Sequence, residues 1–135
     1  MFDNYAYLYV EDDPSSREIM QILMENAMDV HSLTIFDHSA DFIERLRLLS
    51  HVPDVILLDI HVAPHDGFKM LTLLRADPSY RDAKVIAVTA SVMNEEVTKL
   101  RTSGFDGAIA KPLSVQTFPA MMSRVLAGET VWHIE

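Results

Sequence analysis

Short apolar runs alternate along this chain with longer segments in which apolar residues recur at the spacing of a helix. The apolar runs predict five strands, at Tyr5–Val10, Val30–Phe36, Asp54–Leu58, Lys84–Val88 and Gly107–Ala110. In the third and fourth runs almost every residue is apolar, instead of every second one. Such runs are typical of strands that are covered on both faces, as in a parallel sheet between two layers of helices.

Five helices are predicted in the segments that follow these strands, because apolar side chains recur there every three or four residues. Two of them begin after Asp13 and after Ser39, and the other three cover Gly67–Ala76, Val92–Ser103 and Ser114–Leu126. The alternation of strand and helix predicts a doubly wound α/β domain. Its five-stranded parallel sheet would have right-handed crossovers and helices on both faces.

Two aspartates are predicted to begin helices rather than to take part in chemistry. Asp13 stands directly before Pro14, and aspartate as N-cap with proline at the first helical position is a favourable start. Asp66 has the corresponding place before the third helix.

The first helix carries two neighbouring apolar rows, so its buried face has two readings. The spacing favours a core face made of the residues Ile19, Ile22, Leu23 and Ala27. The adjacent row holds the methionines Met20, Met24 and Met28. Methionine in a helix usually fills core space, so burial of part of this row is the favoured interpretation and an exposed row is the alternative.

Composition and charge narrow the class of protein. The chain has 135 residues, of which 49% are hydrophobic and 23% charged, as expected for one globular domain. It has no cysteine, which excludes disulfides, cysteine-ligated zinc and thiol catalysis. The net charge of −9, without a Lys/Arg run, opposes binding to nucleic acid or to an anionic membrane surface. No signal peptide and no apolar run of about 20 residues is found, so we expect a cytoplasmic protein.

Charged and polar residues follow four of the five predicted strands. Glu11 and Asp12 come after the first, Asp59 after the third, Thr89 after the fourth and Lys111 after the fifth. The carboxyl ends of parallel strands meet at one edge, where α/β sheets bind ligands. Carboxylates gathered there repel one another unless a cation joins them, and Mg²⁺ prefers such oxygen ligands. A carboxylate beside Mg²⁺, a lysine and a threonine can together accept a phosphoryl group.

Five short motifs carry a specific resemblance over about residues 4–126. They are Tyr9-Val10-Glu11-Asp12-Asp13-Pro14, Leu57-Leu58-Asp59, Asp66-Gly67, Val88-Thr89-Ala90 and Lys111-Pro112. In this order and with these gaps the chain resembles the CheY-like receiver domain of two-component response regulators. The resemblance implies the strand order 2-1-3-4-5.

The resemblance also implies a role for each residue at the predicted sheet edge. Asp59 would be the phospho-acceptor, Asp12 a direct Mg²⁺ ligand and Glu11 an acidic neighbour that acts through water. His61 would offer its backbone carbonyl to the metal.

Thr89 and Lys111 match the residues that hold the phosphoryl oxygens, and the bond between Lys111 and Pro112 is a candidate cis peptide. The His61 side chain and the Ser91 hydroxyl occupy positions that in receivers tune the lifetime of the phosphorylated state.

Two positions depart from the family pattern. Receivers usually place proline four residues after the acceptor, where this chain has Ala63, with Pro64 one residue later. We expect an altered loop beside an intact pocket. The aromatic switch residue of receivers is Ala108 here, so the usual coupling of a threonine to an aromatic ring cannot work in this chain.

These features predict a receiver domain over residues 1–126 and a short tail over 127–135 without an output domain. The expected function is that of a single-domain response regulator, not an enzyme, which takes a phosphoryl group from a histidine kinase or phosphotransfer protein. It would signal by contact with a downstream protein, with a homodimer as a further possibility. Among single-domain receivers, the segments Ala87-Val88-Thr89-Ala90 and Lys111-Pro112-Leu113-Ser114 resemble the DivK-like subgroup. Trp132 in the tail is predicted to cover an apolar patch or a partner.

Two other functions remain open at this stage. A pseudo-receiver that works without phosphorylation is favoured by Ala108 and by the shifted Pro64. A Mg²⁺-dependent phosphatase of the haloacid dehalogenase type would also use aspartate, threonine and lysine. That family needs Asp-x-Asp at the nucleophile, where this chain has Asp59-Ile60-His61.

Overall fold

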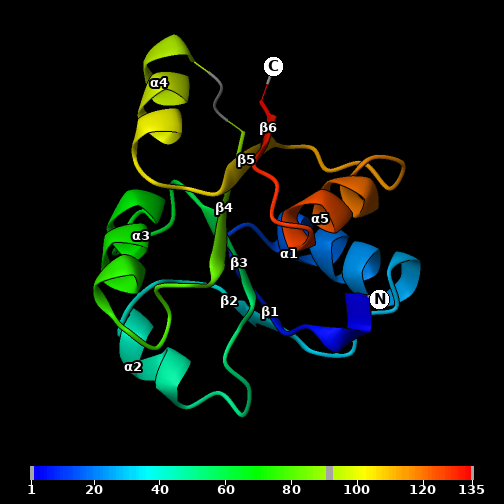
Figure 1. The fold of residues 1–135 in the computed structure, drawn as a ribbon, viewed down its shortest axis with the longest axis horizontal. Coiled ribbons are helices and arrows are strands. Elements are labelled where there is room, and N and C mark those ends of the chain that lie inside the picture. Colours follow the sequence, from blue (N-terminus) through cyan, green and yellow to red (C-terminus); the bar gives the residue numbers. More distant parts are fainter. Residues whose placement is uncertain (1, 91–92, 135) are drawn as a thin grey trace.

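The computed structural model describes residues 2–90 and 93–134 and shows one parallel sheet with helices on both faces (Figure 1). The strand order is β2-β1-β3-β4-β5-β6, in six strands. The strands are β1 (Tyr7–Val10), β2 (Leu33–Phe36), β3 (Val55–Asp59), β4 (Lys84–Thr89), β5 (Gly107–Ala110) and β6 (Val131–His133).

The helices are η1 (Phe2–Asn4), α1 (Pro14–Gln21), η2 (Ile22–Ala27), α2 (Phe42–Arg47), α3 (Gly67–Ala76), α4 (Asn94–Thr102) and α5 (Phe118–Leu126). None of the helices in the described part of the chain is long and apolar enough to span a membrane.

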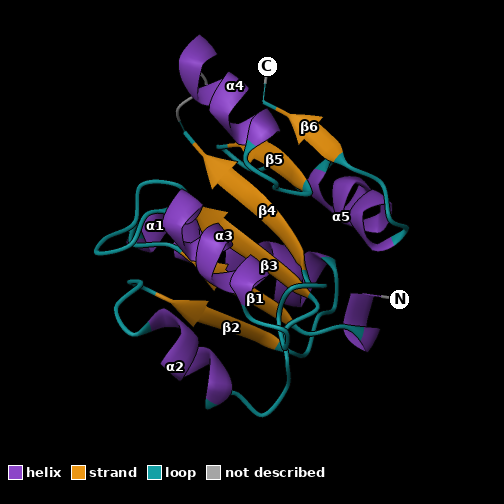
Figure 2. Ribbon diagram, turned by 60° about the vertical axis from the view of Figure 1, so that its left-hand side comes forward, coloured by secondary structure: helices purple, strands orange, loops and turns teal. Residues whose placement is uncertain are grey.

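Helices cover both faces of the sheet (Figure 2), and an apolar layer lies on each face. On one face, Met20 of α1 and Phe118 of α5 pack with side chains from the strands. On the other face, the buried residues Phe42 of α2, Met70 of α3 and Leu100 of α4 form the second layer. All residues of β3 are buried, and so is β4 after its first residue, which confirms the reading of their continuous apolar runs.

The sheet has a sixth strand, which lies in the segment expected to be a short tail, so the prediction of five strands is wrong at this edge. β6 lies parallel to β5, with Val131 beside Gly107 and Trp132 beside Ala108. Gly107 permits this approach, because a Cβ atom there would overlap the backbone oxygen of Val131. A strand of three residues is too short to show a hydrophobic period, and its pairing depends on the neighbouring glycine.

The buried face of the first helix is the other correction. Met20, Leu23, Met24 and Met28 are buried, whereas Ile19 is 42% exposed and Ile22 51% exposed. The methionine row therefore fills the core, and the alternative of an exposed row is wrong. The helix continues from Ile22 to Ala27 as a π-helix, which changes the number of residues per turn and shifts the apolar spacing.

The other elements are confirmed with changed ends. β1 and β2 begin two and three residues later than predicted, and the last helix begins at Phe118 instead of Ser114. Asp13 and Asp66 both act as N-caps, accepting hydrogen bonds from the backbone of Ser16 at 2.9 Å and of Lys69 at 2.8 Å.

Candidate functional site

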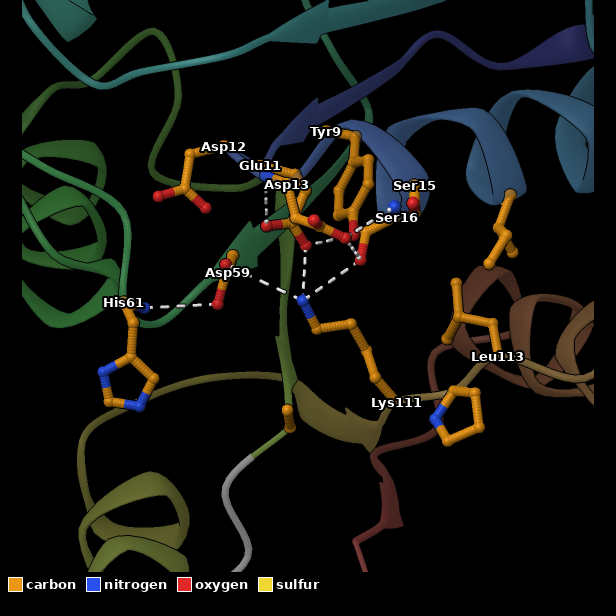
Figure 3. Close-up of a pocket in the computed structure, with 13 residues that line it drawn as sticks. Tyr9, Glu11, Asp12, Asp13, Ser15, Ser16, Asp59, His61, Lys111 and Leu113 are labelled. Atoms are coloured by element: carbon orange, nitrogen blue, oxygen red, sulfur yellow. Dashed lines mark hydrogen bonds and ion pairs between the residues drawn. The ribbon is translucent and has the colours of Figure 1, made fainter.

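Three carboxylates meet at the carboxyl edge of the sheet, as predicted. Glu11 and Asp12 follow β1, and Asp59 is the last residue of the neighbouring strand β3. One oxygen from each lies within 4.8 Å of the other two. Glu11 is fully buried, Asp59 is 5% exposed and Asp12 is exposed, so the cluster runs from the core to the surface. Figure 3 shows it beside a cavity of about 550 Å³.

The Glu11 carboxylate is held from three sides. Its Oε1 accepts hydrogen bonds from the Tyr9 hydroxyl at 2.8 Å and from Lys111 Nζ at 2.6 Å. Its Oε2 accepts one from the Asp13 backbone N–H at 3.2 Å. Burial, together with the nearby Asp59 carboxylate, raises the pKa of Glu11, and the bonds from Lys111 and Tyr9 oppose that rise. Burial beside Glu11 likewise raises the pKa of Tyr9.

Asp59 has a donor or a cation near each carboxylate oxygen. The His61 backbone N–H donates to Oδ1 at 3.2 Å, and Lys111 Nζ lies 3.8 Å from Oδ2. Lys111 directly follows β5 and reaches both acids from there. Its peptide bond to Pro112 is cis, as the resemblance implied. One ammonium therefore faces two carboxylates, the arrangement expected of a group that balances charge in the cavity (Figure 3).

The donor set fits a hard divalent cation. Glu11, Asp12 and Asp59 each offer carboxylate oxygen, which Mg²⁺ and Ca²⁺ bind in preference to nitrogen or sulfur. Asp12 is exposed, so water can complete the coordination of an ion there. The arrangement can hold a cation next to a carboxylate nucleophile.

Thr89 and the His61 imidazole do not belong to the cluster of three carboxylates. Thr89 ends β4 and is fully buried, and its backbone oxygen accepts from the Lys111 N–H at 2.8 Å. The His61 imidazole points away from the carboxylates in Figure 3 and contacts Glu96 of α4, with 3.2 Å between Nε2 and Oε1. Ser91 lies outside the described residues.

The loop after β3 follows an unusual path and leaves the cavity intact. The peptide bond between Ala63 and Pro64 is cis. The buried Ser39 ties this loop to the start of α2: its N–H donates to the Ala63 carbonyl at 3.2 Å, and its Oγ accepts from the His65 N–H at 2.7 Å. The shifted proline is thus accommodated within the loop.

Sequence reasoning missed Tyr9 and Glu96. Tyr9 lies in the apolar run of β1 and its hydroxyl donates to Glu11, so its position two residues before Glu11 was the available signal. No signal in the sequence pointed to Glu96, because its contact with His61 arises only from the packing of α4.

The comparisons with known proteins agree with this geometry. The family model described as the response regulator receiver domain matches residues 7–123. The response regulator Rre1 of Synechocystis is 27% identical over 130 residues, which are 96% of this chain and 54% of that protein. The histidine-protein kinase BarA of Shigella flexneri is 29% identical over 122 residues, 90% of this chain but 13% of the kinase.

The subgroup similarity is partial. The polar-differentiation response regulator DivK of Brucella ovis is 38% identical over 68 residues, half of this chain and 55% of that protein. This chain therefore spans between 13% and 55% of the length of these three relatives.

A solved structure supports the same assignment of fold. The signal receiver domain of a DNA-binding response regulator from Colwellia psychrerythraea 34H superposes with a TM-score of 0.78 at 22% identity. The match covers 91% of this chain and 98% of that one. Taken with the motifs at the sheet edge, the family match over residues 7–123 shows that this chain belongs to the response regulator receiver domain family of two-component systems.

Proposed function

We propose that Asp59 accepts a phosphoryl group from a phosphohistidine, carried by a histidine kinase or a histidine phosphotransfer protein. The observation that supports this most directly is the position of its carboxylate, which lines an open cavity with Lys111 Nζ 3.8 Å from Oδ2. A nucleophile beside a fixed cation can receive a phosphoryl group, because the cation offsets charge on the transferred oxygens.

In this reaction an Asp59 carboxylate oxygen forms a bond to phosphorus, and the bond between phosphorus and the donor's histidine nitrogen breaks. The electron pair of the broken bond stays on that nitrogen. The His61 N–H holds Oδ1 and so directs Oδ2 toward Lys111. Lys111 and the Thr89 hydroxyl would hold the phosphoryl oxygens.

We propose Mg²⁺ as the ion of the acidic cluster. Glu11, Asp12 and Asp59 would hold it with their side chains and His61 with its backbone carbonyl. When bound, Mg²⁺ supplies positive charge that neutralises phosphoryl oxygens, as in other phosphoryl transfers.

An apolar hollow next to the cavity supports a helical phosphotransfer domain as the donor. It measures about 670 Å³ and lies between the end of α1 with η2 on one side and the segment before α5 on the other. Ile22 and Val115 in it are 51% and 53% exposed, and Ile19 and Leu113 line both this hollow and the acceptor cavity. A partner seated here would carry its histidine to Asp59, and exposed apolar side chains of this kind are suited to the face of a helix.

The remaining parts of the function stay predictions. They are signalling through a downstream protein or a homodimer, absence of an enzymatic activity on other substrates, and location in the cytoplasm. The phosphatase alternative is not favoured, because the family match is to the receiver domain.

The test is incubation with acetyl phosphate and Mg²⁺, followed by intact mass measurement of the chain and of its Asp59→Asn variant. Gain of one phosphoryl group that is absent from Asp59→Asn supports the proposal. An unchanged mass with folded protein would instead support a pseudo-receiver, and steady hydrolysis of unrelated phosphate esters would support a phosphatase. Omission of Mg²⁺ tests the metal separately.

A further inference from the structure

Helix α4 is attached to its surroundings by few buried groups. Of its nine residues only Leu100 is buried, and the helix lies at the edge of the molecule between α3 and β6 (Figures 1 and 2). Val97 is partly buried against the same apolar layer, and Lys99 lies over the Phe68 ring of α3, with Nζ 4.0 Å from the centroid. Segments with few buried contacts move at low cost in free energy, so α4 is suited to shift as a unit.

One side of α4 touches the loop that follows the acceptor. The His61 N–H donates to Asp59 Oδ1 at 3.2 Å, and the imidazole of the same residue lies 3.2 Å from Glu96 in the first turn of α4. His61 therefore contacts Asp59 through its backbone and α4 through its side chain. The His61 side chain is 61% accessible and the Glu96 side chain only 20%, so the imidazole is the partner that water can reach.

The other side of α4 contacts the C-terminal strand β6. The Arg101 guanidinium lies over the Trp132 ring, 5.2 Å from its centroid. Trp132 pairs with Ala108 of β5 and packs against the apolar layer formed by α2, α3 and α4.

We propose that α4 couples the state of Asp59 to the C-terminal strand β6, through His61–Glu96 on one side and Arg101–Trp132 on the other. The inference rests on the proposed function, because its trigger is a phosphoryl group on Asp59. That group adds acceptor oxygens beside the His61 N–H. The residue shifts toward them, its contact with Glu96 changes, and α4 carries the displacement to Trp132.

The test uses the full chain and the emission of Trp132, which is its only tryptophan. Acetyl phosphate and Mg²⁺ are added, and emission and intact mass are followed together. The expected result is an emission change that appears with the phosphoryl mass and disappears as the mass is lost. In Glu96→Ala the mass gain persists and the emission change is lost.

Glu95→Ala is the matched control, because it removes an exposed acid from the same first turn of α4 and leaves the contact with His61. It is expected to respond like the unmodified chain. The coupling is overturned if the phosphorylated chain keeps its original emission, or if Glu96→Ala responds as fully as Glu95→Ala. Failure of the proposed function looks different, since the mass itself then stays unchanged and the trigger of the coupling is lost with it.

Discussion

The Lys111 ammonium lies 2.6 Å from Glu11 Oε1, although the two residues are 100 positions apart in the sequence. Its distance to Asp59 Oδ2 is longer, 3.8 Å, so Lys111 is bound more closely to the buried acid than to the acceptor. This preference keeps the charge of Glu11 compensated inside the protein. In the proposed reaction Lys111 would therefore have to share its hydrogen bonds between Glu11 and the phosphoryl group on Asp59.

Lys111→Met is expected to destabilise the metal-free protein, because it leaves the buried Glu11 carboxylate without its cation. Removing one partner of a buried pair costs about 3–5 kcal/mol, and the loss here should be at the low end because Lys111 is partly accessible. Urea denaturation measures the change in unfolding free energy. Lys69→Met, on an exposed position of α3, is the control and should change it little. Equal stabilities of the two variants would contradict the interpretation.

Mg²⁺ is expected to stabilise the chain against unfolding, since the ion binds the folded acidic cluster and not the unfolded chain. At a concentration of 100 times its Kd it would add about 2.7 kcal/mol. Asp12→Asn should reduce this stabilisation, because it removes one of the three clustered carboxylates. Asp13→Asn keeps all three and serves as the control. The measurement is the melting temperature with and without Mg²⁺, and stabilisation that survives in Asp12→Asn would contradict the assignment.

Tyr9→Phe is expected to lower stability by about 1–3 kcal/mol, the usual cost when a buried carboxylate loses a hydrogen-bond donor. The ring stays in place and only the 2.8 Å bond to Glu11 is removed. In Glu11→Gln the same tyrosine substitution should cost less, because the charge it stabilises is gone. A double-mutant cycle in urea measures the coupling, and a coupling of zero would show that the hydroxyl acts independently of Glu11.

Tyr7 is expected to make stability depend on alkaline pH. Burial raises the pKa of its phenol from 10.0 to about 12 in the folded protein, where its hydroxyl donates to the Phe2 carbonyl at 3.0 Å. The unfolded chain releases this proton first, so the stabilisation is complete below pH 10 and is lost as the pH rises from about 10 to 12. Chemical denaturation across this range measures the free energy of unfolding of the chain and of Tyr7→Phe. As the pH rises, the value for the chain should fall relative to that for Tyr7→Phe. A constant difference would contradict it.

Gly107→Ala is expected to displace β6, because the added Cβ overlaps the Val131 backbone oxygen. Trp132 would become more exposed, and its emission should move to longer wavelength in the unphosphorylated protein. Gly104→Ala is the matched control: its φ of +107° makes the substitution unfavourable, but no atom lies within 4 Å of the added carbon. A red shift in both variants would indicate general unfolding, which far-ultraviolet circular dichroism detects.

The sequence alone determined the alternation of the first five strands with helices and the residues at the carboxyl edge. The continuous apolar runs of β3 and β4 are a local property of the chain, and the position of Asp59 at the end of β3 follows from them. Since parallel strands end at one edge, the meeting of Glu11, Asp12 and Asp59 was predictable without knowing any contact. Three of the acids that contribute to the net charge of −9 thus lie in one cluster, whose oxygen donors fit a divalent cation.

Only the tertiary structure decided which of two apolar rows the first helix buries, since both rows are apolar and the π-helical turn shifts the spacing. It also decided that Lys111 binds Glu11 more closely than Asp59. β6 depends on a partner strand and on the missing side chain of Gly107. These features come from contacts between residues far apart in the chain, and local hydrophobic patterns carry no information about such contacts.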